Sequence, residues 1–329
     1  MKHLAMSMTL LALTTACTPN SGNIPIVDNF SNAATGAVTK APGAQIPVTT
    51  GEIQKLVYNV GPIDLPAGTQ VEQSLKKPAT LNFQVSEDVW MVGFTPKIVD
   101  DRGTPLAGNL LYKAILINKN EENLTCKGGN NGNPFAVASG TLTEVSLPQN
   151  YGYALLKEDA LEAQVVLTND SEEDLFGVYF SFELKALPME KSQGIQDVRP
   201  MLLDIDPCQY QPIAVEPSAF VEKSKTFQIS ESGKLLLASG ILSKHGVHVS
   251  LTHGSGNTPT ILPFWTAESE MDDMHRVINL DPNPFVDTTG KPIHEGDRLI
   301  LGTAFNNFSD EWQNDATAAA MIYLAPSAE

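Results

Sequence analysis

Short apolar segments separated by turn residues run through this sequence from about residue 55 to its end. The segments 79–85, 89–99, 109–118 and 175–187 are examples, rich in Val, Ile, Leu, Phe and Tyr. Gly, Pro, Asn and Asp gather between such segments, which recur roughly every 8–15 residues. This pattern predicts an all-β protein built as a sandwich or jelly roll, and it argues against a helical bundle.

The chain is long enough for more than one domain. Its 329 residues exceed the usual size of a single domain. The apolar pattern is interrupted between residues 190 and 218, on both sides of the short segment 201–205. We therefore expect a first β-sandwich over residues 51–213 and a second over residues 214–329.

Signals for helices are few. Residues 155–162 and 266–276 combine several charged side chains with apolar residues at helical spacing. We expect short helices of two or three turns in these two segments.

The first seventeen residues resemble an export signal. A lysine precedes a short apolar core, residues 4–13, which is too short to span a bilayer. The sequence LTTAC at 13–17 resembles a bacterial lipobox, which implies a lipidated Cys17 and attachment to a lipid membrane. Thr18, by analogy with Gram-negative sorting, favours the outer membrane. An ordinary secretory signal is the alternative.

Residues 18–50 predict a flexible tether. They are rich in Pro, Thr, Ser, Asn, Gly and Ala and have no periodicity of 2 or 3.6. A flexible segment of this length spans on the order of 30 Å. The segment would therefore hold a folded body away from a membrane.

The net charge of the chain limits its partners. The 38 acidic and 21 basic residues give −17 at pH 7. Nucleic-acid binding depends on neutralising phosphates with Lys and Arg, so we expect no nucleic-acid partner.

Two cysteines remain after Cys17. In an oxidising compartment Cys126 and Cys208 are able to form a disulfide, although two free thiols are the alternative. Neither has a Cys or His nearby, which disfavours a metal site built on them.

Histidines are few, and the sequence KHGVHVSLTH contains their one cluster. In an unbroken strand His245 and His248 point to opposite faces, while His253 lies too far along the strand to join His245 in a chelate. A turn or bulge at Gly246 would change this geometry. No nucleophile, phosphate-binding or dinucleotide-binding motif is present in the sequence.

Several segments resemble the copper type II, ascorbate-dependent monooxygenases, the family of the peptidylglycine α-hydroxylating monooxygenase. The similar segments follow the same order in both and are VWMVGF (89–94), LLYKA (110–114), LPQNYGY (147–153), LLLASGILSKHG (235–246), 296–297, 305–307 and Met321. The resemblance covers about residues 60–329. It implies two tandem jelly-roll-like β-sandwich domains, which agrees with the pattern of apolar segments.

The copper ligands of that family are largely missing. The positions that match its first copper site carry Tyr112, Lys113 and Val166 in place of histidines. Those that match its second site carry Ile241 and Ser243, and only Met321 is retained. Copper in such sites needs imidazole nitrogens, so the resemblance implies a scaffold that has lost its metal centres.

Three functional hypotheses follow, in order of preference. The first is a non-catalytic surface lipoprotein without a cofactor that binds a protein, a glycan or a small molecule, with its ligand between the domains near Tyr112, Lys113, Val166, Ile241 and Ser243. There Lys113 would face an anion. The second is a copper-binding oxidoreductase with other ligands, around His245, His248, His253 and Met321. The third is a structural component of the cell envelope.

Overall fold

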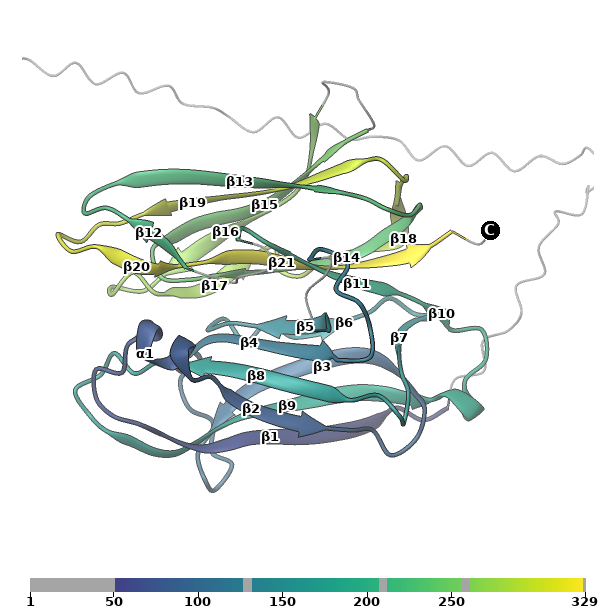
Figure 1. Cartoon of the computed structure of the whole chain (residues 1–329), viewed down its shortest axis with the longest axis horizontal. Coiled ribbons are helices and arrows are strands. Elements are labelled where there is room, and N and C mark those ends of the chain that lie inside the picture. The colour runs from purple at the N-terminus through teal and green to yellow at the C-terminus, as the bar shows by residue number, and fades with distance from the viewer. Residues whose placement is uncertain (1–50, 127–131, 207–211, 256–260, 328–329) are drawn as a thin grey trace, which may run out of the picture. The chain divides into compact units, whose positions relative to one another are not determined.

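The computed structural model describes residues 51–126, 132–206, 212–255 and 261–327. The chain divides into two compact units, Met1–Gln45 and Ile46–Glu329. The first unit and its predicted signal peptide lie outside the described residues, as does the predicted tether 18–50. The second unit contains two β-sandwiches, one after the other in the sequence (Figure 1).

The strands of the first sandwich occupy the segments that the apolar pattern marked. They are β1 (Gln54–Leu65), β2 (Ala79–Phe83), β3 (Val89–Val99), β4 (Leu111–Asn118), β5 (Asn133–Ala138), β6 (Val145–Ser146), β7 (Tyr151–Leu155), β8 (Leu161–Leu167), β9 (Leu175–Pro188) and β10 (Gln196–Asp197). The helical elements are short and are α1 (Val71–Lys76), η1 (Gly108–Leu110) and η2 (Met189–Lys191).

The second sandwich is built from strands alone within the described residues. They are β11 (Arg199–Asp204), β12 (Ile213–Val215), β13 (Phe220–Gln228), β14 (Gly233–Leu242), β15 (Gly246–Gly254), β16 (Ile261–Met271), β17 (Val277–Asp281), β18 (Phe285–Ile293), β19 (Arg298–Asn306), β20 (Gln313–Ala316) and β21 (Ala318–Pro326). Among the described residues, no helix is long and apolar enough to span a bilayer.

The sheet topology of each sandwich is that of a jelly roll. In the first roll, one sheet has the order β1-β9-β3-β7-β10, with β6 paired to β3, and the other sheet has the order β2-β8-β4-β5. In the second, the orders are β11-β21-β14-β18 and β13-β19-β15-β16-β17. Each roll has eight main strands, which are β1, β2, β3, β4, β5, β7, β8 and β9 in the first roll and β11, β13, β14, β15, β16, β18, β19 and β21 in the second. In both rolls the first and eighth main strands pair in one sheet, and the second and seventh pair in the other. The predicted all-β fold with two tandem jelly rolls is confirmed.

The two rolls also share a hydrogen-bonded turn after the seventh main strand. In the first roll, the side-chain amide of Asn169 donates to the carbonyls of Leu65, Pro66 and Glu173, and its oxygen accepts from Ser171. In the second roll, Asn307 donates in the same way to Val215, Glu216 and Glu311, and accepts from Ser309. The same topology with the same turn identifies the rolls as an internal repeat.

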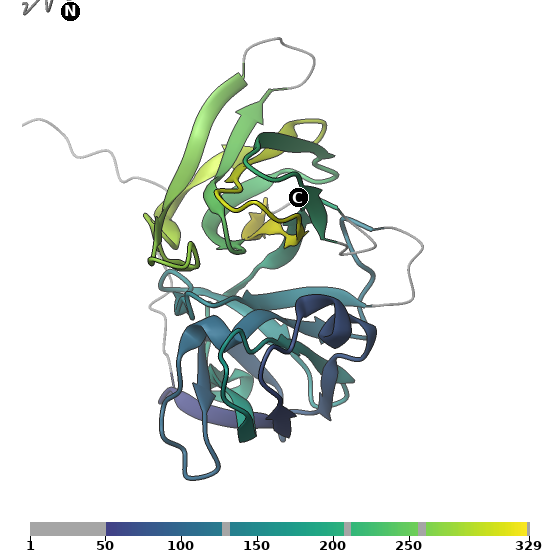
Figure 2. The ribbon, with the colours of Figure 1, turned by 90° about the vertical axis from the view of Figure 1, so that its left-hand side faces the viewer.

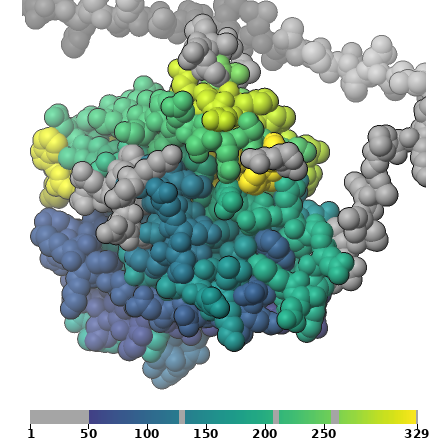
Figure 3. All heavy atoms as spheres, turned by 45° about the vertical axis from the view of Figure 1, so that its right-hand side comes forward, coloured from purple at the N-terminus to yellow at the C-terminus, as the bar shows by residue number. Residues whose placement is uncertain are grey.

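The four larger sheets are stacked in layers, and the sheet of β11, β21, β14 and β18 is the face of the second roll that packs against the first (Figures 1 and 2). Strand β21 is buried on both faces. Its residues Ala319, Met321, Tyr323 and Ala325 belong to the hydrophobic core of the first roll, and Ala318, Ala320, Ile322 and Leu324 belong to that of the second. This explains the continuous apolar sequence AAAMIYLA, because a strand with two buried faces does not alternate. In the space-filling view the two rolls meet along a seam (Figure 3).

The predicted helices are wrong. Residues 155–162 join β7 to β8 through a turn in which the Asp159 carboxylate accepts the N–H of Leu156. Residues 266–271 continue β16, and residues 272–276 form the turn before β17. In both segments, charged residues at the edge of a strand imitate the spacing of an amphipathic helix. The helix α1 had no recognised signal in the sequence.

The strand pairing places the start of the second roll earlier than the expected boundary between residues 213 and 214. Strand β11 pairs with β21 over the register Arg199↔Leu324 to Asp204↔Ala319. Since its partner lies more than a hundred residues away in the sequence, the short apolar segment at β11 could not be assigned to the second roll from its neighbours.

Candidate functional site

The positions that match the first copper site lie on β4 and β8, next to one another. Lys113 is directly opposite Val166 in the strand register, and Tyr112 packs with Val166 and Val71. A bulge interrupts β4 between Leu111 and Lys113. Because the bulge breaks the alternation of side chains, Tyr112 and Lys113 both reach the second roll.

These two side chains bind groups of the chain itself. The Lys113 ammonium lies 3.7 Å from the Asp204 carboxylate of β11, with both side chains buried. The Tyr112 hydroxyl donates to the carbonyl of Asp315 at 3.1 Å. Burial raises the pKa of Tyr112 above its usual range, so this hydroxyl stays protonated. The anion that Lys113 faces in the structure is the Asp204 carboxylate.

The positions that match the second copper site lie on β14 and β21. Ile241 and Met321 are both in the hydrophobic core of the first roll, and Met321 is 1% exposed. The Ser243 hydroxyl oxygen accepts the N–H of Thr317 at 2.9 Å. The structure brings Ile241 and Met321 to one face of one sheet, but their surroundings are apolar.

The residues at these six positions do not fit copper. Val166 and Ile241 have no donor atom, and Lys113 is engaged with Asp204. The Met321 thioether is a soft ligand, but its neighbours in the core supply no imidazole or thiolate. We therefore derive no chemistry through copper from this set of residues.

The alternative ligands His245, His248 and Met321 are not brought together. Met321 is in the core between the rolls, while His248 lies on β15 in the outer sheet of the second roll. His245 lies in the turn between β14 and β15 with φ of 62°, and its ring is 5.4 Å from that of His275. His253 bonds to Asp297 at 2.8 Å. Among the described residues, no group of three or more His, Cys, Asp or Glu side chains is arranged to hold a metal ion.

A groove opens between the two rolls, near the contact of α1 with β20. Its inner part is a cavity of about 60 Å³, lined by Tyr112 and Ser243 among others. Its outer part has a volume of about 340 Å³ and is lined by residues of both rolls, including Glu72, His245, Glu311, Trp312 and Asn314. The two parts share Gln70, Val71, Asp170, Lys244 and Asp315.

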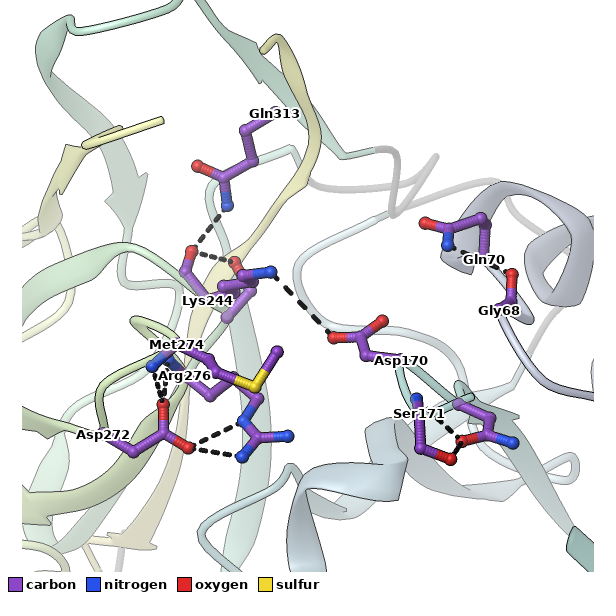
Figure 4. Close-up of polar contacts among 11 residues, drawn as sticks. Gly68, Gln70, Asp170, Ser171, Lys244, Asp272, Met274, Arg276 and Gln313 are labelled. Atoms are coloured by element: carbon purple, nitrogen blue, oxygen red, sulfur yellow. Dashed lines mark hydrogen bonds and ion pairs between the residues drawn. The ribbon is translucent and has the colours of Figure 1, made fainter. Parts of the chain in front are cut away.

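An ion pair crosses this groove. The Lys244 ammonium of the second roll lies 4.0 Å from the Asp170 carboxylate of the first, as Figure 4 shows. On the side of the second roll, the Gln313 amide donates to the Lys244 carbonyl, and Arg276 pairs with Asp272. Gln70 lies on the opposite side, beside α1. These contacts hold polar side chains around the opening.

Burial changes the acid–base properties of two groups that line the groove. It raises the pKa of the Asp315 carboxyl. Burial, together with the adjacent charge of Lys244, lowers the pKa of His245 to about 4. His245 is 4% exposed, and no hydrogen-bond partner contacts its Nδ1. At neutral pH its ring is therefore uncharged.

Of the five positions expected to surround a ligand, the structure places Tyr112 and Ser243 at the groove. Val166 lies behind Tyr112 in a small apolar cluster, and Ile241 lies in the core. Our sequence analysis missed the exposed aromatic residues Phe308 and Trp312, which follow β19. The repeated pattern Asn-x-Ser-x-Glu, at 169–173 and at 307–311, is the sequence signal that marks this turn.

The predicted modifications of cysteine fall largely outside the described residues. Cys17 and Cys208 both lie there, so lipidation and the disulfide stay predictions. Cys126 follows Thr125, whose hydroxyl donates to the carbonyl of Leu202 on β11 at 2.9 Å.

The comparisons with known proteins give no family. No protein-family model matches the sequence, and no curated protein matches it. Two solved viral structures are similar at low scores. One concerns a triple jelly-roll fold and turret assembly in an archaeal virus, with 11% identity and a TM-score of 0.22, over 82% of this chain and 59% of that one.

The other is a turret protein of Sulfolobus turreted icosahedral virus. It has 13% identity and a TM-score of 0.18, over 85% of this chain and 98% of that one. This chain thus spans less than two thirds of the first of the two structures. At these scores the likeness says nothing of function.

Proposed function

We propose that this protein is a binding protein and not an enzyme, with its ligand in the groove between the rolls. The observation that carries this proposal is that residues of both rolls line one opening of about 340 Å³. This volume is in the range of small-molecule sites, which often lie between domains. The proposed ligand of the groove is a protein, a glycan or a small molecule.

The residues at the former ligand positions support the absence of copper chemistry. Tyr112 and Lys113 join the two rolls through Asp315 and Asp204. In the family that the sequence resembles, two histidines occupy these places. We infer a degenerate relative of the copper type II monooxygenases, in which contacts between the rolls have replaced the first metal site.

The proposal includes an exported protein anchored through a lipidated Cys17 to the outer membrane. It also includes a disulfide between Cys126 and Cys208, which suits an oxidising compartment. In this arrangement the folded body stands off the membrane on residues 18–50 and presents the groove to ligands outside the cell or in the periplasm.

The experiment compares the soluble body, residues 51–329, with a variant whose groove is filled. Gln70 is exposed and lines both parts of the groove, so Gln70→Trp should block it. Gln73→Trp, on the exposed side of α1, is the matched control. We expect a component of a cell-envelope extract to be retained by the wild type and Gln73→Trp and lost by Gln70→Trp.

Two results would overturn this proposal. Equal retention by Gln70→Trp and Gln73→Trp would place the ligand elsewhere. Stable loading with one or two copper atoms per chain, together with ascorbate-dependent oxygen uptake, would make the protein a copper oxidoreductase with ligands other than those of its relatives.

A further inference from the structure

The repeated turn differs between the two rolls in its exposed side chains. In the first roll, Asp170 follows the asparagine of the Asn-x-Ser-x-Glu sequence and Asp174 follows its glutamate. In the second roll, Phe308 and Trp312 occupy these two places. Phe308 is 53% exposed and Trp312 is 56% exposed. Since the first turn keeps its hydrogen bonds with carboxylates at these places, the fold does not require aromatic rings there. Two large exposed aromatic side chains close together, which the fold of this turn does not require, indicate a binding surface.

Trp312 lines the groove among polar side chains. Carboxylates and amides surround it there, and they are Gln70, Glu72, Asp170, Glu311, Gln313, Asn314 and Asp315. Glu311 and Asn314 are exposed, so the Glu311 carboxylate and the Asn314 amide are open to a ligand, whereas the Glu72 carboxylate already accepts from Lys76 at 2.8 Å. The groove thus combines an aromatic ring with many planar groups that form hydrogen bonds.

A second exposed aromatic ring, that of Phe308, lies next to the groove. Phe308 stacks on His275 with ring centroids 4.7 Å apart and an angle of 26° between the ring planes. His275 in turn lies beside His245, which lines the groove. The stack holds the Phe308 ring in one orientation, so it costs little entropy on binding.

We propose that the ligand of the groove is a neutral saccharide, with a sugar ring stacked on Trp312 and its hydroxyls bonded to the carboxylates and amides around it. This inference rests on the proposed function and names its ligand class. Sugar rings present C–H groups on their faces, which contact the negative face of an aromatic ring. Their hydroxyls donate to carboxylates in strong, charge-assisted hydrogen bonds.

The charge of the groove selects against other ligands. The outer part of the groove is lined by four carboxylates, Glu72, Asp170, Glu311 and Asp315, and by one lysine, Lys244. Lys244 pairs with Asp170 and Glu72 pairs with Lys76 of α1, so the excess negative charge rests on Glu311 and Asp315. An anionic polysaccharide or the surface of an anionic bilayer would be repelled at this opening. A neutral polyhydroxyl compound is not repelled in this way, and its hydroxyls donate hydrogen bonds to the exposed carboxylates.

The test measures binding of a panel of neutral oligosaccharides to the body, residues 51–329, by calorimetry and by quenching of tryptophan fluorescence. Of the three tryptophans, Trp265 is buried and Trp90 is partly buried, so an aqueous quencher reports mainly on Trp312. We expect at least one oligosaccharide to bind and to protect Trp312 from the quencher. Trp312→Ala should weaken binding at least tenfold, while Trp312→Phe should retain most of it.

Phe176→Ala is the control, since Phe176 is 73% exposed on the first roll and does not line the groove. It should bind as the wild type does. Three results would overturn the proposal of a neutral saccharide ligand. They are absence of binding to the panel, unchanged binding by Trp312→Ala, and preferred binding to anionic glycans or anionic vesicles. If a protein or small molecule is still retained in a manner sensitive to Gln70→Trp, only the saccharide fails. If nothing is retained, the proposed function fails as well.

Discussion

Asn169 and Asn307 lie at the same point of the two jelly rolls and make the same set of hydrogen bonds. Each side-chain amide donates to three carbonyls. Two of them belong to adjacent residues between the first and second long strands of the roll or at the edge of that connection, and the third lies four residues further along the asparagine's own turn. Each is also joined by its own backbone N–H, to Thr69 and to Ala219 respectively. The pair ties the start of each roll to its seventh main strand.

Removing either asparagine should destabilise the protein by a similar amount. Asn169→Ala and Asn307→Ala each leave several carbonyls without a donor, at a cost of about 2–4 kcal/mol in the free energy of unfolding. Urea denaturation followed by circular dichroism measures the effect. Asn82→Ala, at an exposed position of β2, is the control and should change stability by less than about 0.5 kcal/mol. A loss confined to one of the two variants would contradict the equivalence of the turns.

Replacing one member of the buried pair Lys113–Asp204 should lower the free energy of unfolding more than replacing both members. Lys113→Met leaves a buried carboxylate without its cation, and we expect a loss of about 3–5 kcal/mol. Burial already raises the pKa of Asp204, which shows that its charge is disfavoured there. Asp204→Asn in addition to Lys113→Met should recover most of the loss and keep the bond from the Asp206 N–H.

The same denaturation measurements apply, as a double-mutant cycle. The control is Lys55→Met, which removes the more exposed pair with Glu183 and should change stability by at most about 1 kcal/mol. Additive effects of the two core substitutions would show that Lys113 and Asp204 do not interact.

His245 should make stability fall as the pH falls through the range between its unfolded and folded pKa. The folded pKa is about 4, below the ordinary value of 6.5, so the unfolded chain binds a proton first. The contribution of His245 is therefore complete above about pH 6.5 and lost by about pH 4, and we expect it to be on the order of 3 kcal/mol.

His245→Asn tests this, since Asn tolerates the positive φ of 62° at this position. The difference in melting temperature between wild type and variant should change across this pH range. Asn82→Ala, at an exposed position of β2, removes no titratable group and is the control, which should keep the pH profile of the wild type. A wild type and a His245→Asn variant with parallel pH profiles would contradict the expected titration.

A disulfide between Cys126 and Cys208 is expected from the position of the loop before β5. Thr125 bonds to Leu202 on β11, and Cys208 follows the end of β11 by four residues, a length that spans at most about 14 Å. Peptide mapping of the oxidised body should find the two cysteines in one cross-linked peptide. Replacing both by serine should cost several kcal/mol, because the bridge closes a long loop. Two alkylatable thiols in the oxidised protein would disprove it.

Local patterns predicted the strands well where a strand is apolar and bounded by turn residues. The segment 89–99 coincides with β3, and 175–187 falls within β9. The repeat of the rolls escaped notice because few residues carry it. The sequences VEQS at 71–74 and VEKS at 221–224 are nearly the same, yet the first forms α1 and the second lies in β13. Tertiary contacts decide between helix and strand for such a segment, and they cannot be read locally.

Two of the residues expected around a ligand line the groove, but most of the other residues of the groove were not anticipated. A ligand between the domains near Tyr112 and Ser243 was expected, and both line the groove. Asp170, Lys244 and Trp312 were not anticipated, because they lie in three turns that are distant in the sequence. Only the pairing of strands brings these turns to one end of the molecule.

The position of β21 imposes an order on the maturation of the chain. It is the last of the described strands, it pairs with β11 and β14 on either side, and four of its side chains complete the core of the first roll. Until this strand has been synthesised, the first roll therefore lacks part of its own interior. A chain with this arrangement completes the core of its first half only when its last described strand has folded onto it.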